Sequence, residues 1–285
     1  MSSDRPLAAP PQPGFEPGGR KRRRRRRGDR SRTRDWTHLL PNFFTTGNLA
    51  AGFYAIVKTT AGDYDRAALA LVVAGVCDIL DGRLARLTDN TSRFGSEYDS
   101  IADAVSFGVA PAMIAFTAGG LHDLGWTGWV LAFMFTACAA LRLARFNVSP
   151  ARWEGRFEGL PSPAAAGMVV ASVWLSGFLA DSGLPLHLPS VLPGLGAATL
   201  GLLMVSPIPY RSFKEVHFRG NYRATVLMVI GFAVILSKPS VTFFLVGLAY
   251  AASGPVEWYW RWRTGRSLEE IGPPLAVDPG PGVAR

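Results

Sequence analysis

The sequence has few of the residues from which many enzymes build a zinc or nucleophilic site. It holds two cysteines, Cys77 and Cys138, and four histidines among 285 residues. The cysteines lack metal-site spacing and are expected to pack inside helices. The histidines are isolated, and no nucleophile elbow or Ser/His/Asp order is present. A zinc centre and covalent catalysis therefore have no support in the sequence.

Charged residues are also scarce, at 18% against 48% hydrophobic residues, and they are clustered. A helix of ~17–25 apolar residues can cross ~30 Å of hydrocarbon. Six to eight such segments are expected, and the count depends on the short seventh one. The segments lie at 39–58, 66–88, 97–119, 125–146, 161–181, 188–206, 222–237 and 239–260. The predicted fold is an all-α, polytopic helix bundle of about eight transmembrane helices.

Basic residues are distributed unevenly along the chain. Residues 1–36 are rich in Arg, Pro and Gly, so we expect a disordered tail there, a membrane domain over 37–263 and a flexible tail over 264–285. The tail charges either fix topology or bind anionic lipid headgroups, and no nucleic-acid module accompanies them. Arg and Lys recur on alternate loops, so the positive-inside rule predicts a multi-pass protein of the cell membrane with both termini cytoplasmic.

Four aspartates recur at fixed spacing from Asp78 to Asp103, in the pattern D-x2-D-G-x2-A-R-x8-G-x3-D-x3-D. Asp78 and Asp81 share one helix face, and Asp99 and Asp103 share a face of the next helix. Two facing helices can therefore present four carboxylates to one point, at the cytoplasmic ends of the spans. Oxygen ligands suit Mg²⁺, Mn²⁺ or Ca²⁺, and a pair of such ions serves phosphoryl displacement.

Small residues and one arginine are interleaved with the aspartates. Gly82, Ala85 and Gly95 leave room for a ligand to approach the backbone, although close helix packing is the alternative explanation. Arg86 suits phosphate oxygens, or else anchors the helix at the membrane edge.

The complete motif resembles that of the CDP-alcohol phosphatidyltransferase family. The resemblance implies a homodimeric membrane enzyme in which Asp78, Asp81 and Asp99 hold two divalent cations, Mg²⁺ or Mn²⁺, over the diphosphate of CDP-diacylglycerol. Asp103 would be the general base that deprotonates the acceptor hydroxyl, while also serving as a metal ligand. The expected CDP-lipid-binding residues are Asp81, Gly82, Ala85, Arg86, Gly95, Asn42 and Thr45.

Further segments are similar to the phosphatidylserine synthase subfamily, and they imply L-serine as the acceptor and phosphatidylserine and CMP as products. These segments are 40–49, 99–112 with its SFGVAPA run, 140–147, 157–167 and 204–214. The candidate acceptor or phosphate-binding residues are Ser106, Arg142, Arg145 and Asn147.

Alternatives stay open at this point. Arg142 and Arg145 could instead anchor their helix at the membrane edge. The acceptor could be glycerol 3-phosphate or inositol phosphate. From a different class, a cation transporter would also place acids inside a bundle. We also expect Ser106 and the stretch from Gly108 to Pro111 to loosen the helix that carries Asp103.

Overall fold

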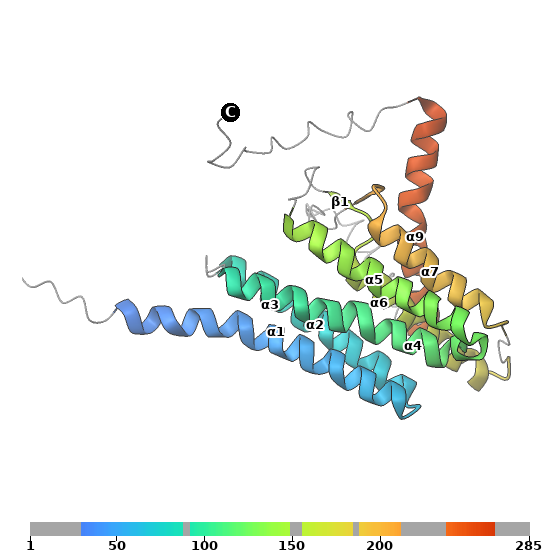
Figure 1. Ribbon diagram of the computed structural model, residues 1–285, viewed down its shortest axis with the longest axis horizontal. Coiled ribbons are helices and arrows are strands. Elements are labelled where there is room, and N and C mark those ends of the chain that lie inside the picture. Colours follow the sequence, from blue (N-terminus) through green and yellow to red (C-terminus); the bar gives the residue numbers. More distant parts are fainter. Residues whose placement is uncertain (1–29, 88–91, 149–155, 185–187, 212–237, 266–285) are drawn as a thin grey trace, which may run out of the picture.

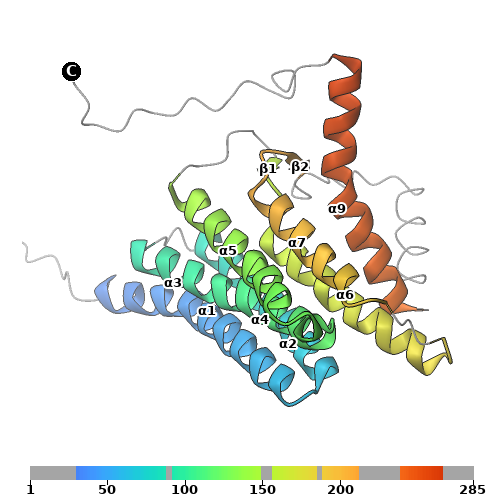
Figure 2. The same ribbon diagram turned by 45° about the vertical axis from the view of Figure 1, so that its right-hand side comes forward.

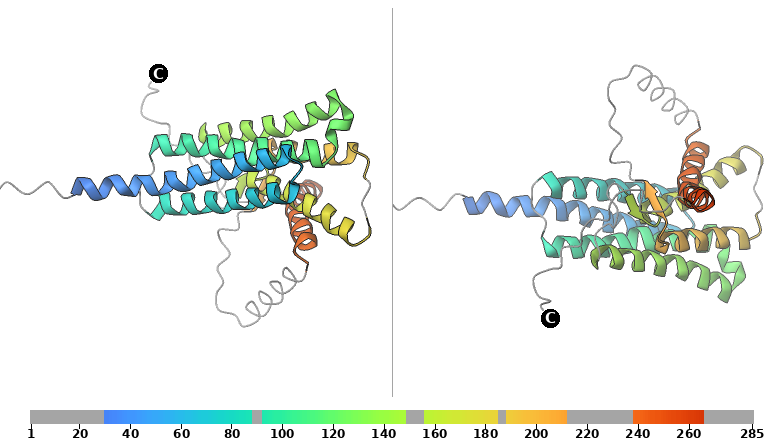
Figure 3. Two further views of the ribbon diagram at one scale, coloured as in Figure 1. Left: turned by 90° about the horizontal axis from the view of Figure 1, so that it is seen from below. Right: turned by 90° about the horizontal axis from the view of Figure 1, so that it is seen from above.

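The computed structural model describes residues 30–87, 92–148, 156–184, 188–211 and 238–265, with side chains from Asn42 onward. Helices α1 (Arg30–Thr60) and α2 (Tyr64–Leu87) form an antiparallel pair that lies side by side in Figure 3. Their short connection turns at Gly62, whose φ of 75° favours glycine. Asp63, directly before α2, forms an ion pair of 3.0 Å with Arg66 in the first turn of that helix.

The next helical segment is continuous from Arg93 to Ala118 but changes its winding in the middle. Helix α3 (Arg93–Asp103) passes into the π-helical segment η1 (Ala104–Val109) and then into α4 (Ala110–Ala118). Pro111 lacks a backbone N–H and is placed at the start of α4, where the change of winding removes the need for that donor. The expected loosening at Ser106 and Gly108 is confirmed as this π-helical segment.

The other helices of the described residues belong to the same bundle. They are the short η2 (Leu121–Leu124), α5 (Trp126–Val148), α6 (Ser162–Asp181), α7 (Val191–Val205) and α9 (Pro239–Thr264). Helix α5 packs on α7, and α6 packs on both α2 and α9. Helix α9 is steeply inclined to the other helices, and its C-terminal part extends beyond them (Figures 1 and 2).

The expectation of an all-α fold needs one small correction. Strands β1 (Arg156–Glu158) and β2 (Pro209–Arg211) form a two-stranded antiparallel sheet, in which Phe157 pairs with Tyr210. Each strand has only three residues, so neither gives a periodic pattern by which a sequence reveals a strand.

The core is built largely from alanines, which allow helices to approach closely. The largest buried side chains are Tyr210, Phe107, Phe135 and Ile114. Cys138 is buried in this core and Cys77 is partly buried, and both are free thiols, as expected of packing residues.

Four helical segments of the described chain are long and apolar enough to cross a membrane. They are Arg93–Ala118, Trp126–Val148, Ser162–Asp181 and Pro239–Thr264. Helix α7 is apolar but has only 15 residues, whereas the sequence had indicated a span over 188–206. Helices α1 and α2 are not among these four segments, and both carry polar residues of the site described below. The expected short span at 222–237 and residues 1–29 of the expected tail lie outside the described residues. Helix α1 begins at Arg30, inside the tail expected over 1–36 and before the apolar run.

Candidate functional site

Three carboxylates from two helices converge on one point. Asp78 on α2 and Asp99 and Asp103 on α3 each offer an oxygen, and these oxygens lie within 4.8 Å of one another. All three residues are partly buried. The i, i+4 spacing of Asp99 and Asp103 places both on one face of α3, as the sequence predicted, and their carboxylates lie near that of Asp78.

Asp81 lies in the same part of α2 but is not a member of this group of three. It is buried, and its Oδ2 accepts a hydrogen bond of 3.0 Å from the hydroxyl of Thr45 on α1. A buried carboxylate requires such a donor, because an unpaired buried acceptor is costly. The sequence named Thr45 as a candidate CDP-lipid-binding residue, and the structure places it against Asp81.

Asn48 is a site residue that the sequence analysis missed. Its side-chain amide donates to Oδ1 of Asp103 at 2.9 Å, and it is fully buried. The signal was available, because Asn48 is a polar amide inside an apolar run and lies one helical turn after Thr45. Helix α1 therefore faces the aspartates with a row of polar side chains.

The close packing of α1 on η1 holds Asn48 in place. The Ser106 hydroxyl donates to the backbone oxygen of Asn48 at 2.9 Å, and Ser106 is fully buried. A Cβ on Gly52 would lie 2.8 Å from Cα of Ser106, so only glycine permits this approach. Ser106, expected to contact the acceptor, here bonds the backbone that carries Asn48.

The three carboxylates fit a divalent cation. Oδ1 of Asp99 is buried and has no hydrogen-bond partner among the described residues. Three carboxylates this close also repel one another unless a cation or a proton intervenes. An all-oxygen ligand set suits Mg²⁺ or Mn²⁺ and disfavours zinc, which usually takes nitrogen or sulfur ligands.

The small residues of the motif have two different surroundings. No described atom beyond the helix itself lies within 4 Å of the place where a Cβ of Gly82 would stand. Gly82 is exposed, so close packing against another described helix does not explain this glycine. A Cβ on Gly95 would lie 3.0 Å from Oγ of Ser92 and 3.3 Å from Oδ1 of Asn42, so this glycine lets Asn42 approach α3. Arg86 is exposed and Ala85 is partly buried.

Arg142 is the best placed of the candidate acceptor residues. Its Nη1 donates to Oγ of Ser162 at 3.0 Å, and Ser162 is buried at the start of α6. Its Nε is buried without a partner among the described residues. The guanidinium is close enough to Asp103 and Asp78 for their charges to act on it. A fixed guanidinium with a spare N–H can bind an anionic group.

Arg145 and Asn147 have other partners. Arg145 forms an ion pair with Glu158 of β1, and the Asn147 amide donates to Oγ of Ser100 on α3 at 2.9 Å. These contacts join the end of α5 to β1 and to α3, so both residues bind the elements around the site together.

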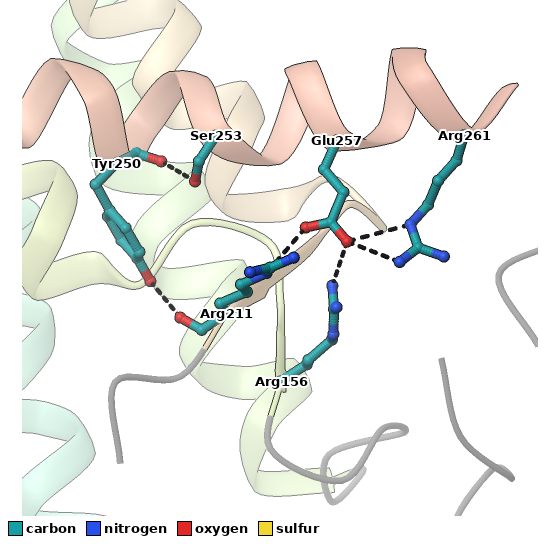
Figure 4. A network of polar contacts seen from close by, with 6 residues as sticks. All are labelled: Arg156, Arg211, Tyr250, Ser253, Glu257 and Arg261. Atoms are coloured by element: carbon teal, nitrogen blue, oxygen red, sulfur yellow. Dashed lines mark hydrogen bonds and ion pairs between the residues drawn. The ribbon is translucent and has the colours of Figure 1, made fainter. Parts of the chain in front are cut away.

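The two-stranded sheet is fixed to α9 by a polar network (Figure 4). Glu257 contacts Arg156 of β1 at 2.9 Å and Arg211 of β2 at 3.4 Å. The Tyr210 hydroxyl donates to the backbone oxygen of Ala251 at 2.9 Å. Burial, with a smaller effect of Tyr250, raises the pKa of Tyr210 to about 12, so the phenol keeps its proton at neutral pH.

The chain is similar to known proteins over most of its length. Residues 38–253 match the family model described as CDP-alcohol phosphatidyltransferase. The chain is 35% identical over 225 residues to the CDP-diacylglycerol–serine O-phosphatidyltransferase of Helicobacter pylori (strain ATCC 700392 / 26695), covering 78% of this chain and 91% of that protein. It is 32% identical over 226 residues to the protein of the same name from Mycobacterium tuberculosis (strain ATCC 25618 / H37Rv), covering 76% and 77%. For the Bacillus subtilis (strain 168) protein of that name, the identity is 32% over 178 residues, covering 62% and 93%.

Proposed function

The chain belongs to the CDP-alcohol phosphatidyltransferase family, and from that membership we propose that it moves the phosphatidyl group of CDP-diacylglycerol to the hydroxyl of L-serine. The products are phosphatidylserine and CMP. The observation that carries the proposal is the convergence of Asp78 on α2 with Asp99 and Asp103 on α3, two helices that both pack against α1. The names of the relatives support serine as the acceptor.

The carboxylates are the residues that would hold two divalent ions, Mg²⁺ or Mn²⁺. Asp78, Asp81 and Asp99 are the proposed ligands, with Asp103 as a further contact. Such ions, when bound, neutralise the diphosphate and make its phosphorus a better electrophile. Thr45 holds one oxygen of Asp81 by its hydrogen bond, which limits the orientations of that carboxylate.

Asp103 is the proposed general base. It takes the proton of the serine hydroxyl, and the freed oxygen forms a bond to the phosphorus on the lipid side. The bond from that phosphorus to the bridging oxygen breaks, and CMP leaves with the electron pair. Asn48 fixes the Asp103 side chain through its amide, so that the second carboxylate oxygen can face the acceptor.

Substrates are bound by the other motif residues in this proposal. Gly82, Ala85, Arg86 and Gly95, with Asn42, line the CDP-lipid site. Arg142 binds the carboxylate of serine, because its guanidinium is fixed by Ser162 and retains an unpartnered N–H. Ser106, Arg145 and Asn147 shape the acceptor side through the contacts that they make.

The proposed topology has about eight spans, both termini in the cytoplasm and the site at the cytoplasmic face of the cell membrane. The excess of Arg and Lys on the connections next to α2, α3 and α5 supports this orientation. The proposal includes a membrane domain over 37–263 between two tails, and a homodimer, which the family resemblance implies.

The proposal is tested with the purified full chain, CDP-diacylglycerol and a panel of labelled alcohols, with and without divalent ion. Incorporation of serine with release of an equal amount of CMP is the expected result. Incorporation of glycerol 3-phosphate or inositol phosphate in place of serine would keep the family and overturn the acceptor. Release of no CMP with any alcohol would overturn the reaction itself.

A further inference from the structure

Three arginines surround one carboxylate at the junction of the two-stranded sheet and α9, apart from the aspartates of the site (Figure 4). Arg156 and Arg261 each place an Nη atom 2.9 Å from Oε1 of Glu257, and Nε of Arg211 lies 3.4 Å from Oε2. Among the described residues, no second carboxylate pairs with these arginines. One carboxylate balances one of three guanidiniums, so this arginine cluster keeps an excess of positive charge.

Two arginines of the cluster are mostly buried, and the third is exposed. The side chains of Arg156 and Arg261 are 14% and 17% exposed, whereas that of Arg211 is 75% exposed. A guanidinium has five N–H donors. The contacts with Glu257 use one donor of Arg156, one of Arg211 and two of Arg261. Donors therefore remain beside Arg211, where a ligand can enter.

The position of the cluster on α9 places it at the surface of the bilayer. Helix α9 has 26 residues, which at 1.5 Å per residue span about 39 Å, more than the ~30 Å of the hydrocarbon layer. Glu257 and Arg261 lie in its last turns. The neighbouring Trp258 and Trp262 are 45% and 71% exposed, and exposed tryptophans are typical of the level of the lipid headgroups.

We propose that the arginine cluster binds the phosphate group of an anionic phospholipid. Planar guanidiniums bind phosphate oxygens in pairs, and Glu257 holds two of them in place before the ligand arrives. Glu257 also reduces the mutual repulsion that would otherwise separate the three charges. The lipid is favoured over a free phosphate ion because Glu257 and Arg261 are each followed directly by an exposed tryptophan, Trp258 and Trp262, of the kind found at headgroup level. This binding goes beyond the proposed reaction, which uses none of these residues.

The test uses the full chain in nanodiscs of phosphatidylcholine with a minor fraction of phosphatidylglycerol, followed by native mass spectrometry of the retained lipid. Arg211→Gln should lower retention of phosphatidylglycerol about tenfold, which corresponds to the loss of ~1.4 kcal/mol from one charged contact. Arg263→Gln is the matched control, because Arg263 is an exposed arginine of the same helix end outside the cluster. The Arg263→Gln variant should retain as much phosphatidylglycerol as the unchanged protein does.

Two outcomes would overturn the proposal. One is equal retention by the unchanged protein, Arg211→Gln and Arg263→Gln, or an equal loss in both variants, because either result removes the cluster from lipid binding. The other is release of phosphatidylglycerol by millimolar inorganic phosphate, which would identify a site for free phosphate. Arg211 is exposed, so thermal unfolding should be unchanged in both variants, and CMP release reports that the active site remains intact.

Discussion

The side-chain amide of Asn48 donates to Oδ1 of Asp103 at 2.9 Å, and so joins two helices through residues 55 positions apart in the chain. Asn48 is in turn held by Ser106, only three residues after Asp103, through its backbone oxygen. The proposed base is therefore oriented by α1, and α1 is placed by the segment that follows the base. Orientation of a catalytic carboxylate by a neighbouring donor is worth a measurable part of the rate.

Asn48→Ala should lower kcat by about 10- to 100-fold, as is usual for the loss of a residue that orients a functional group. The KM for CDP-diacylglycerol should change little, because the Asn48 amide contacts Asp103. Steady-state kinetics with both substrates measures this split. Thr60→Ala is the control, because the Thr60 hydroxyl bonds only the backbone of its own helix. A similar loss of kcat in Thr60→Ala would contradict the orienting role.

Asp103→Asn should lower turnover by about 10²- to 10⁴-fold, the usual contribution of a general base, because an amide cannot accept the hydroxyl proton. Binding of CDP-diacylglycerol should be largely retained. Single-turnover kinetics and equilibrium binding of the CDP-lipid measure the two effects separately. If binding falls as much as the rate does, Asp103 is not primarily a base.

Asp99→Asn should raise the concentration of Mg²⁺ or Mn²⁺ that gives half of the maximal rate, because it removes a charge from the three converging carboxylates. Titration of the metal at saturating substrate measures this shift, and excess chelator should abolish activity in the unchanged protein. Asp123→Asn removes an exposed carboxylate of η2, outside the group of three aspartates, and should leave the titration unchanged. Activity that persists in chelator would exclude the metal site.

Gly82→Ala should leave the protein folded but raise the KM for CDP-diacylglycerol by roughly tenfold, equivalent to ~1.4 kcal/mol of lost binding. The reason is that no described atom would contact the added Cβ, so the methyl group occupies the space assigned to the ligand. Gly75→Ala is matched to it, since Gly75 lies on the same helix and is equally open. An unchanged KM in both variants would mean that Gly82 does not face the substrate.

Gly52→Ala should destabilise the fold instead. Its Cβ would lie 2.8 Å from Cα of Ser106, and a helix backbone cannot move as a flexible side chain can. Overpacking of this kind costs about 1–3 kcal/mol. Thermal unfolding in detergent should therefore show a lower midpoint for Gly52→Ala than for Gly75→Ala. Equal midpoints would show that α1 and η1 separate without cost.

Much of the site follows from the sequence because helical spacing is local information. The i, i+4 spacing of Asp99 and Asp103 fixes their common face, and Asp78 lies on the helix before them. Four carboxylates were predicted to meet at one point, and three of them do, whereas Asp81 is not a member of the group. The predicted starts of three helices also lie within a few residues of the observed ones at Trp126, Ser162 and Pro239, because apolar runs end where polar residues begin.

Other contacts could not be predicted, because they depend on how distant segments pack. The bond from Asn48 to Asp103, the pairing of Arg145 with Glu158 and the contacts of Glu257 with β1 and β2 each join parts of the chain that carry no shared pattern. The same is true of the open space at Gly82, which spacing alone could not distinguish from close helix packing.

The π-helical segment Ala104–Val109 holds one residue more than regular α-helical winding would need between the aspartates and the apolar half of this helix. Each residue added to or removed from an α-helix turns everything beyond it by about 100°, and a π-helical turn is one residue longer than an α-helical one. Loss of a single residue within Ala104–Val109 would restore regular winding and keep Asp99 and Asp103 on nearly the same face relative to the apolar half from Pro111 onward. Loss of a residue from the regular part between them would instead rotate the two halves by about 100°. The register between the reacting half and the membrane-embedded half of this helix is therefore set by residue count as well as by residue identity.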